Sequence, residues 1–429
     1  MPAITRALPQ RASFALQVSI VVLLLAASSA PTPLYAVYRA EWGFAPVTLT
    51  VVFGVYAVAV LAALVTVGRL SDHVGRRPVL LAAVALQVVA LAIFATASDV
   101  TALLAARIVQ GFSTGIGLGA LGAGLLDINK ERGTRANGVA PLAGTALGSL
   151  LSGVVVQLLP APTHLVYVAL MAAFVLTMVG IALMPETSTK LTGAVASLRP
   201  RFAAPQTTRA AMLAALPALI AVWSLAGFYA SLGPTLVQRL SGSTSYVAGA
   251  LSLAILSGAA ALTIHLLRAL PPRPVMIFGT AALLVGAAST LVMVEIGSTV
   301  GFFAATVVAG VGFGAGFQGG LRSVLPLARP HERAGLLSTM YAVCYLAFGL
   351  PAVVAGAAVD SAGVLRTAAP YLIVVMVLAA LALTGLALRS RRPSTLVVPD
   401  PDEHIDQAVT GAAAYPMPRV SALTAPSGP

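Results

Sequence analysis

Charged residues are scarce in this chain of 429 residues: only 9% are Asp, Glu, Lys or Arg, whereas 59% are hydrophobic. A soluble domain carries about 25% charged residues, because its surface faces water. A chain of this length with so few charges cannot cover a water-facing surface. We therefore expect it to face lipid.

Motifs for disulfides, metals and nucleotides are also missing. There is one cysteine, Cys344, and the five histidines lack metal-ligand spacing, which excludes a disulfide framework and a Cys-ligated metal site. No GxxxxGK[ST] loop is present to cradle phosphates, so direct drive by ATP is excluded. None of the 13 acidic residues lies at the middle of an expected span. We predict no enzyme, no catalytic residue, no metal and no cofactor.

Long apolar runs fill the rest of the sequence. A helix needs about 20 apolar residues to cross the hydrocarbon core of a bilayer. Runs of that length lie near 14–36, 46–68, 78–97, 101–126, 136–159, 163–184, 210–236, 246–266, 274–294, 298–321, 335–357 and 368–388. The sequence predicts an all-α membrane protein of twelve transmembrane helices. We assign 1–185 to an N-terminal six-helix half, 186–208 to a cytoplasmic linker, 209–390 to a C-terminal six-helix half and 391–429 to a disordered cytoplasmic tail.

The net charge of +12 follows this topology. Nearly all Lys and Arg lie at the termini or in even-numbered gaps between spans, and the odd-numbered gaps hold only Arg39, Arg239 and Arg366. Basic residues gather on the cytoplasmic side of membrane proteins. We expect both termini in the cytoplasm, a multi-pass protein of the cell (plasma) membrane with the bilayer as its partner, no nucleic acid, and a monomer.

Three matches indicate an internal repeat. Residues 111–115 (GFSTG) match 312–316 (GFGAG), 201 residues later, and the pair at 131–132 (ER) matches 332–333 (ER) at the same offset. Residues 77–80 (RPVL) match 273–276 (RPVM), 196 residues later. Duplicated halves with a solute site near the midplane are typical of secondary transporters.

The strongest motif is GRLSDHVGRRP, from Gly68 to Pro78, in the gap between spans two and three. It resembles the GxLaDrxGrkxxl signature of the major facilitator superfamily, whose aspartate meets a helix of the opposite half. The arginines of that signature pair with an acid at the end of span four. The resemblance implies a cytoplasmic latch between the halves, formed by Gly68, Asp72, Gly75, Arg76, Arg77 and Asp127. An ordinary positive-inside loop is the alternative. The second half keeps only Arg273-Pro274, which favours a weaker latch there.

A cation lies inside span four, at Arg107. Charged groups within a span are costly and mark functional sites by default. The run RIVQG resembles a second family motif, RxxqG, whose arginine lies in the central cavity and is linked to proton handling; Gln110 shares its helix face. The alternative is an arginine that snorkels to the interface.

Span five carries Gly144, Gly148 and Gly153, in a run that resembles the GxxxGPxxGG signature of family members that export solutes in exchange for protons. Ser149 and Ser152 replace a proline and a glycine of that signature. A GxxxG pair lets another helix approach closely, so plain helix packing is the alternative.

Span one contains Pro31 and Pro33, which should break the helix near its outer end. We expect Tyr35 and Tyr38 there to contact the outer cavity, although a helix end followed by a turn fits the same residues. In the second half, the candidate cavity residues are the polar or aromatic side chains at membrane depth: Trp223, Tyr229, Gln318, Tyr341 and Tyr345. Such a cavity suits an amphipathic or apolar solute, although packing is an alternative for each residue.

The combined prediction is a transporter that resembles the twelve-span drug:proton antiporter branch and exports a small amphipathic or drug-like solute by alternating access. Protons are the expected coupling ion. Because no midplane acid exists, proton exchange would have to use Asp127, His265 or Arg107. The alternatives are an importer or facilitator of a small metabolite, and a transporter-like membrane sensor.

Replacing Asp72 by Asn separates the transporter from the sensor. If the latch takes part in a transport cycle, D72N abolishes solute flux in vesicles. A sensor that never moves its ligand would bind it with unchanged affinity in D72N and show no flux even in the wild type.

Overall fold

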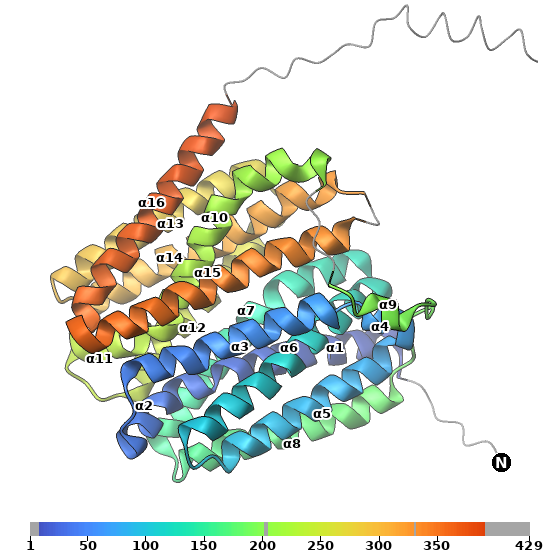
Figure 1. The fold of residues 1–429 in the computed structure, drawn as a ribbon, viewed down its shortest axis with the longest axis horizontal. Coiled ribbons are helices and arrows are strands. Elements are labelled where there is room, and N and C mark those ends of the chain that lie inside the picture. Colours follow the sequence, from blue (N-terminus) through green and yellow to red (C-terminus); the bar gives the residue numbers. More distant parts are fainter. Residues whose placement is uncertain (1–7, 201–204, 330–331, 391–429) are drawn as a thin grey trace, which may run out of the picture. The chain divides into compact units, whose positions relative to one another are not determined.

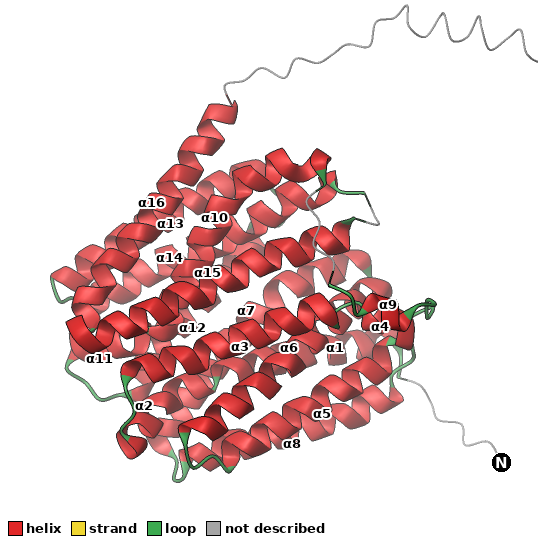
Figure 2. Ribbon diagram, in the orientation of Figure 1, coloured by secondary structure: helices red, strands yellow, loops and turns green. Residues whose placement is uncertain are grey.

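A computed structural model describes residues 8–200, 205–329 and 332–390; the predicted tail at 391–429 lies outside this range. Every regular element of the described residues is a helix (Figure 2). Twelve helices are long and apolar enough to cross a membrane, and each overlaps one predicted run. The predicted fold class is therefore confirmed. Residues up to Leu386 form one compact unit, to which the following description applies.

The first six spans extend from the N-terminus to the linker (Figure 1). They are α1 (Gln10–Ser29) with α2 (Pro31–Trp42), α3 (Pro46–Thr66), α5 (Arg76–Ala95), α6 (Val100–Ile128), α7 (Lys130–Leu158) and α8 (Pro162–Leu183). The short α4 (Leu70–Val74) joins α3 to α5, and α9 (Ala194–Ser197) lies in the linker.

The last six spans repeat this order. They are α10 (Gln206–Ser231) with the short α11 (Gly233–Ser241), α12 (Tyr246–Leu266), α13 (Pro272–Glu295), α14 (Thr299–Val324), α15 (Arg333–Ala362) and α16 (Val364–Ser390). A 3₁₀ turn, Leu325–Leu327, follows α14.

Most of the apolar packing follows the two sets of six spans, and one small buried cluster of Phe53, Ala230 and Leu253 joins them. One buried cluster is drawn from residues between Ile20 and Met184, and two others from residues between Met212 and Leu386. Large apolar side chains on the flanking helices stay exposed, including Leu176 on α8 and Leu381 on α16. Exposed apolar surface of this kind fits a protein that faces lipid.

The first span is interrupted as its prolines predict. Helix α1 ends at Ser29 and α2 begins at Pro31, and a proline removes one helical hydrogen bond. The seventh span has a matching interruption, since α10 ends at Ser231 and α11 carries Pro234. Both short helices end at a glycine with positive φ, +66° at Gly43 and +62° at Gly242, a conformation that L side chains rarely adopt.

Two helix pairs join the halves: α3 packs along α15, and α7 packs along α12 (Figure 1).

We call the end that carries α4 and α9 the linker end and the end that carries α2 and α11 the far end. At the far end the Val47 N–H donates to Asp360 Oδ2 over 3.3 Å, and the Tyr246 N–H donates to Gln157 Oε1 over 2.9 Å. In both bonds, a side chain near the end of one helix caps the start of a helix from the other half.

Small residues set the spacing of these pairs. Between α3 and α15, Gly356 lies against Thr50 and Gly349 lies near Ala57, so this contact runs from the far end to the middle of the helices. Between α7 and α12, Gly153 faces Ala250. Such side chains let the helix backbones approach closely.

Gly144 and Gly148 of α7 pack within the N-terminal half. They lie directly against the α1 backbone at Val22 and Ala26, where a Cβ atom would overlap main-chain atoms. Gly153 instead faces the C-terminal half. Helix α7 is thus held to α1 on one face and to α12 on another.

We expect Gly148→Ala to lower the thermal unfolding midpoint of the purified protein, because a methyl group at this contact overpacks the α1–α7 interface by about 1–3 kcal/mol. Gly258→Ala is the matched control, since nothing lies within 4 Å of a Cβ at that position. Equal melting of the two variants would contradict the close α1–α7 contact.

Candidate functional site

Arg107 is fully buried on α6, and all of its hydrogen-bond partners are neutral. Nε donates to the Tyr35 hydroxyl over 2.5 Å, and Nη1 donates to the Ser28 carbonyl over 2.9 Å. Nη1 also donates to Gln110 Oε1 over 2.6 Å. The guanidinium therefore points inward among α1, α2 and α6 and does not snorkel to an interface.

Gln110 connects this arginine to the break in the first span. Its Nε2 donates to the Ala27 carbonyl over 3.0 Å. In an uninterrupted helix that carbonyl would accept from the N–H four residues later, but Pro31 has no N–H. Gln110 supplies the missing donor, so the α1–α2 break and the Arg107–Gln110 pair complete one another.

Three aromatic rings surround the guanidinium. Its Cζ lies 5.0 Å from the Tyr56 ring centroid, 5.4 Å from Tyr35 and 5.7 Å from Phe94. Rings at such distances attract a cation, more strongly where water is excluded. Among the described residues, no carboxylate pairs with Arg107, and its Nη2 has no hydrogen-bond partner. The site therefore holds a buried positive charge, and Nη2 remains available as a hydrogen-bond donor.

The C-terminal half contributes an aromatic cluster around Trp223. Its ring lies 5.2 Å from Tyr345, 5.5 Å from Phe317 and 5.9 Å from Phe348. Phe348 in turn lies 4.7 Å from Phe53 of α3, which links the cluster to the N-terminal half. Trp223 Nε1 and Gln318 Oε1 are buried without a partner within the described part of the chain.

Two other predicted cavity residues lie elsewhere. The Tyr229 hydroxyl bonds with Thr290 over 2.7 Å and accepts from Thr306 over 3.3 Å, within the packed C-terminal half. Tyr341 is half-buried on α15 and makes none of the ring contacts of the described residues. The structure thus buries Tyr229 in the packed core between helices, whereas the sequence predicted it at a cavity. Tyr38 is likewise a core residue, stacked on Trp42 at 4.7 Å and hydrogen-bonded to Tyr167.

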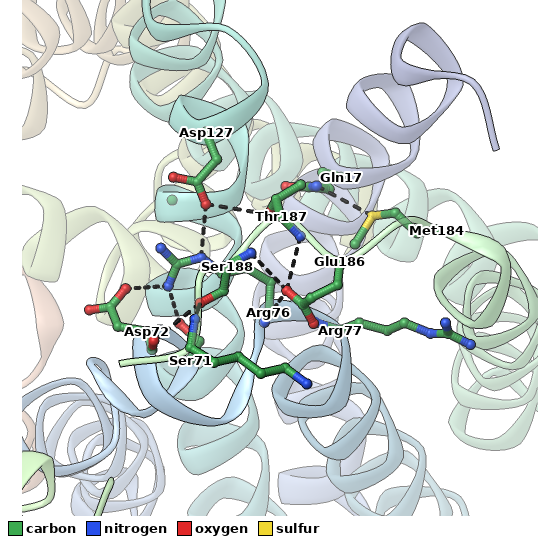
Figure 3. Close-up of polar contacts among 12 residues, drawn as sticks. Gln17, Ser71, Asp72, Arg76, Arg77, Asp127, Met184, Glu186, Thr187 and Ser188 are labelled. Atoms are coloured by element: carbon green, nitrogen blue, oxygen red, sulfur yellow. Dashed lines mark hydrogen bonds and ion pairs between the residues drawn. The ribbon is translucent and has the colours of Figure 1, made fainter. Parts of the chain in front are cut away.

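The latch motif lies at the linker end and centres on Arg76 (Figure 3). The guanidinium pairs with Asp72 and with Asp127, the latter at 3.0 Å from Nε, and Nη1 donates to Ser71 Oγ over 2.7 Å. These contacts join α4, the start of α5 and the end of α6. The structure therefore pairs Arg76 with Asp127, which is the pair that the resemblance implied, and adds Asp72 to the same guanidinium.

Glu186, which follows α8, completes this cluster (Figure 3). Its carboxylate accepts from the Arg76 N–H over 2.8 Å and from the Arg77 N–H over 3.1 Å, at the start of α5. Gly75 has φ +117°, and a Cβ there would lie 2.6 Å from Glu186 Oε2. A glycine is needed here both for the backbone conformation and for the approach of the carboxylate. Gly119 of α6 allows a second close approach, since a Cβ there would overlap the Gly68 backbone, whereas a Cβ at Gly68 would overlap the Leu64 carbonyl.

The electrostatic state of Glu186 follows from these bonds. Burial raises the pKa of this carboxyl, but the N–H donors of Ser188, Arg76, Arg77 and Thr187 together lower its pKa below the ordinary 4.5. Hydrogen bonds to the charged form of a carboxyl favour that form. The linker is thereby fixed to the latch through an ionised glutamate.

Among the described residues, the polar contacts of the latch stay within the first half and the linker. Helix α4 packs against α5, α6 and α9, and the Asp72 carbonyl accepts from Ser188 and from the Leu191 N–H. Arg77 uses its backbone N–H here, whereas Arg76 makes both ion pairs. Where the resemblance implied a contact between Asp72 and the opposite half, this structure shows Asp72 bonded within the first half and the linker. Arg273, the counterpart in the second half, donates to the Leu386 carbonyl over 3.4 Å.

Comparison with known proteins gives the class of this chain. The sequence model of the Major Facilitator Superfamily matches residues 18–270, so the chain belongs to that superfamily. It is a transporter of small solutes and not an enzyme. Among curated protein sequences, none matches the chain at a significant level.

Solved structures share the fold at low sequence identity. A mutant of the nucleoside transporter NupG has a TM-score of 0.67 and 14% identity, with 87% of this chain and 99% of that chain covered. The human organic anion transporter MFSD10 (TETRAN) has a TM-score of 0.56 and 19% identity, with 87% of this chain and all of that chain covered. At these identities the likeness shows the fold alone.

Several residues of the site carry no sequence signal of their own. Tyr56 stacks on Arg107 and donates to Ser28 Oγ over 2.8 Å. Ser149 and Ser152, which depart from the family pattern, donate to the carbonyls of Ala250 and Ala30 over 3.0 and 2.6 Å. These hydroxyls tie α7 to the other half and to the α1–α2 break. Only the tertiary arrangement shows these partners.

Replacing Glu186 by Gln should lower the thermal unfolding midpoint at pH 7, because the ionised acceptor of four N–H groups is lost. The folded-state pKa is depressed, so the charge stabilises the fold above about pH 4.5 and this contribution disappears as pH falls through the lower folded value. The wild-type and E186Q midpoints should therefore converge towards pH 3. A difference that stays constant from pH 7 to pH 3 would contradict the ionised contact.

Proposed function

We propose that this transporter exports a small amphipathic solute by alternating access, in exchange for protons. One observation carries the proposal: buried polar atoms without partners occur beside aromatic rings contributed by both halves. Arg107 Nη2 and Trp223 Nε1 are hydrogen-bond donors, and Gln318 Oε1 is an acceptor. Unsatisfied groups at membrane depth are costly, so a solute that bonds to them is the natural partner.

The residues around these atoms favour a solute with an apolar body and a polar acceptor. The rings of Trp223, Tyr345 and Phe348 offer flat apolar surface, and Phe53 extends this surface into the N-terminal half. The donors are few and fixed in place. Mostly apolar walls with a few placed polar groups are typical of small-molecule sites.

The contacts between the halves support alternating access. Asp360 and Gln157 cap helices of the opposite half at the far end, whereas the latch at the linker end bonds within its own half. If the basic gaps face the cytoplasm, the far end faces outward. The arrangement then corresponds to halves joined by hydrogen bonds at the outer side and to a released inner latch, one of two states of a rocking transporter.

Proton exchange is supported by the position of Asp127. Its carboxylate pairs with Arg76 at 3.0 Å and accepts from the Thr187 hydroxyl over 3.3 Å, and its side chain is 33% exposed. Water can therefore reach it from the linker end. Protonation removes the charge that attracts Arg76 and loosens the link among α5, α6 and the linker. A proton taken up here can bias the position of the latch.

Transport direction and coupling are tested in inverted membrane vesicles with an acidic lumen, loaded with a pH-sensitive dye. A compound selected by resistance profiling of a deletion strain should alkalinise the lumen as it accumulates, because protons leave while the solute enters. We expect D127N to reduce the proton flux per solute at least tenfold. E131Q is the matched control, because it also replaces an acid by its amide. Among the described residues, Glu131 forms an ion pair only with Arg135 of its own helix.

Two results would contradict this proposal. Equilibration of the solute across the vesicle membrane, without accumulation and without any change in luminal pH, would indicate facilitated diffusion. Solute movement out of the inverted vesicles would indicate an importer.

A further inference from the structure

The far end contains a vestibule between the halves, formed by two adjoining cavities. The inner one has a volume of about 340 Å³ and is lined by α2 and α3 of the first half and by α10, α11 and α12 of the second. The outer one, about 470 Å³, is lined mainly by α11 and the residues that follow it. The two share Ala36, Thr235, Gln238 and Tyr246 as wall residues. We use the name vestibule for this pair of cavities.

Two arginines line the vestibule. Arg39 of α2 lines the inner cavity and Arg239 of α11 lines the outer one. They are two of only three basic residues in the odd-numbered gaps of the sequence. The third, Arg366, lines neither cavity. Since most basic residues lie at the linker end, two arginines at one opening of the far end depart from the charge pattern of the chain.

The internal repeat relates these arginines. Arg239 follows Arg39 by 200 residues, Pro234 follows Pro33 by 201, and Gly242 follows Gly43 by 199. In each half, a short helix after the break carries one arginine and ends at a glycine with positive φ. The duplicated fold thus places one cation on each side of the same opening.

Negative charge is kept off the vestibule wall. The acids near the far end are Glu41, Asp99, Glu295 and Asp360, and none lines either cavity. Asp360 accepts from Val47 and Asp99 accepts from the Ala102 N–H of its own helix. Within the described residues, neither Arg39 nor Arg239 forms an ion pair. A cleft lined by one sign of charge focuses the field on its ligand.

A third cation lies directly behind the wall. Tyr35 lines the inner cavity, and its hydroxyl accepts from Arg107 Nε. Arg107 is fully buried without a carboxylate partner in the described chain and has Nη2 free of hydrogen bonds. Its charge is little screened at this depth. The positive potential therefore extends from the opening to the buried arginine.

Flat aromatic side chains complete the inner wall. Tyr35, Phe53 and Tyr246 line it, and Thr32 and Thr235 are also among its wall residues. A volume of about 340 Å³ is at the small end of ligand sites, which start near 300 Å³. This combination matches a single aromatic ring that carries one negative charge.

We infer that the vestibule is a binding site for small aromatic monoanions such as carboxylates, held between Arg39 and Arg239 with the ring against Tyr35 and Phe53. The inference rests on the proposed function only in placing this site on the transport path. It names the solute class more narrowly than an amphipathic compound: an organic anion, attracted by three arginines in series.

Binding is tested on the full-length protein in lipid nanodiscs by calorimetry, with benzoate and its neutral isostere benzamide as probes. The wild type should bind benzoate about tenfold more tightly than benzamide, and this preference should shrink in high salt because exposed charges are screened. The R39Q/R239Q double variant should bind the two probes equally. R366Q, the matched far-end control, should keep the wild-type preference for benzoate. R39K/R239K, which retains both charges, should recover most of the preference that R39Q/R239Q loses.

Three outcomes would overturn the inference: no benzoate binding to the wild type, equal binding of the two probes to the wild type, or an unchanged preference in R39Q/R239Q. Thermal melting of each variant checks its fold. Because binding is measured without flux, a failure here is distinct from a failure of proton-coupled export in vesicles.

Discussion

The hydrogen bonds that Arg107 and Gln110 make to the first span are the interaction on which the rest of the site depends. In a bilayer no water can satisfy a backbone carbonyl, so a proline break requires donors from a neighbouring helix. Gln110 donates to the carbonyl of Ala27, and Arg107 donates to the carbonyl of the next residue, Ser28, in the last turn of α1. Without these donors the break would leave polar groups exposed to hydrocarbon, and without the break the arginine would lack its carbonyl acceptor.

This arrangement positions both the central site and the vestibule. The break directs α2, with Tyr35 and Arg39, toward the opening at the far end, and Tyr35 connects that opening to the buried guanidinium. On its other side, Ser152 of α7 bonds to the Ala30 carbonyl next to the break. Gly148 holds α7 against the same part of α1. A shift of α7 against the second half would therefore be transmitted to the residues around Arg107.

The two ends of the molecule are built from different chemistry. The linker end uses a dense set of ion pairs and N–H···carboxylate bonds around Arg76 and Glu186. The far end uses single bonds from Asp360 and Gln157 to the first turns of α3 and α12. An exposed single hydrogen bond contributes about 1 kcal/mol or less, so the far-end contacts are easily broken. Such weak contacts suit an end that opens in the proposed transport cycle.

Much of this could be predicted from the sequence, because hydrocarbon imposes simple rules on length and charge. The twelve spans, the break at Pro31 and the burial of Arg107 follow from such rules, and the latch residues follow from the motif. The orientation of individual side chains does not, as Tyr229 shows. In a span whose core face and lipid face are both apolar, the sequence carries little periodic signal to separate them. The roles of Glu186 and Asp360 could not be predicted from the sequence either, since both bond to backbone N–H groups far away in the chain.

The claim that the halves rock about the α3–α15 and α7–α12 contacts is tested most directly by distances between spin labels. On a Cys344→Ser background, one pair at Glu41 and Ser241 reports on the far end and another at Lys130 and Leu327 reports on the linker end. When the transported solute is added under a proton gradient, the far-end pair should gain a longer distance while the linker-end pair gains a shorter one. If each pair kept a single, unchanged distance after the solute is added, or if the distances at both ends lengthened together, alternating access by this fold would be contradicted.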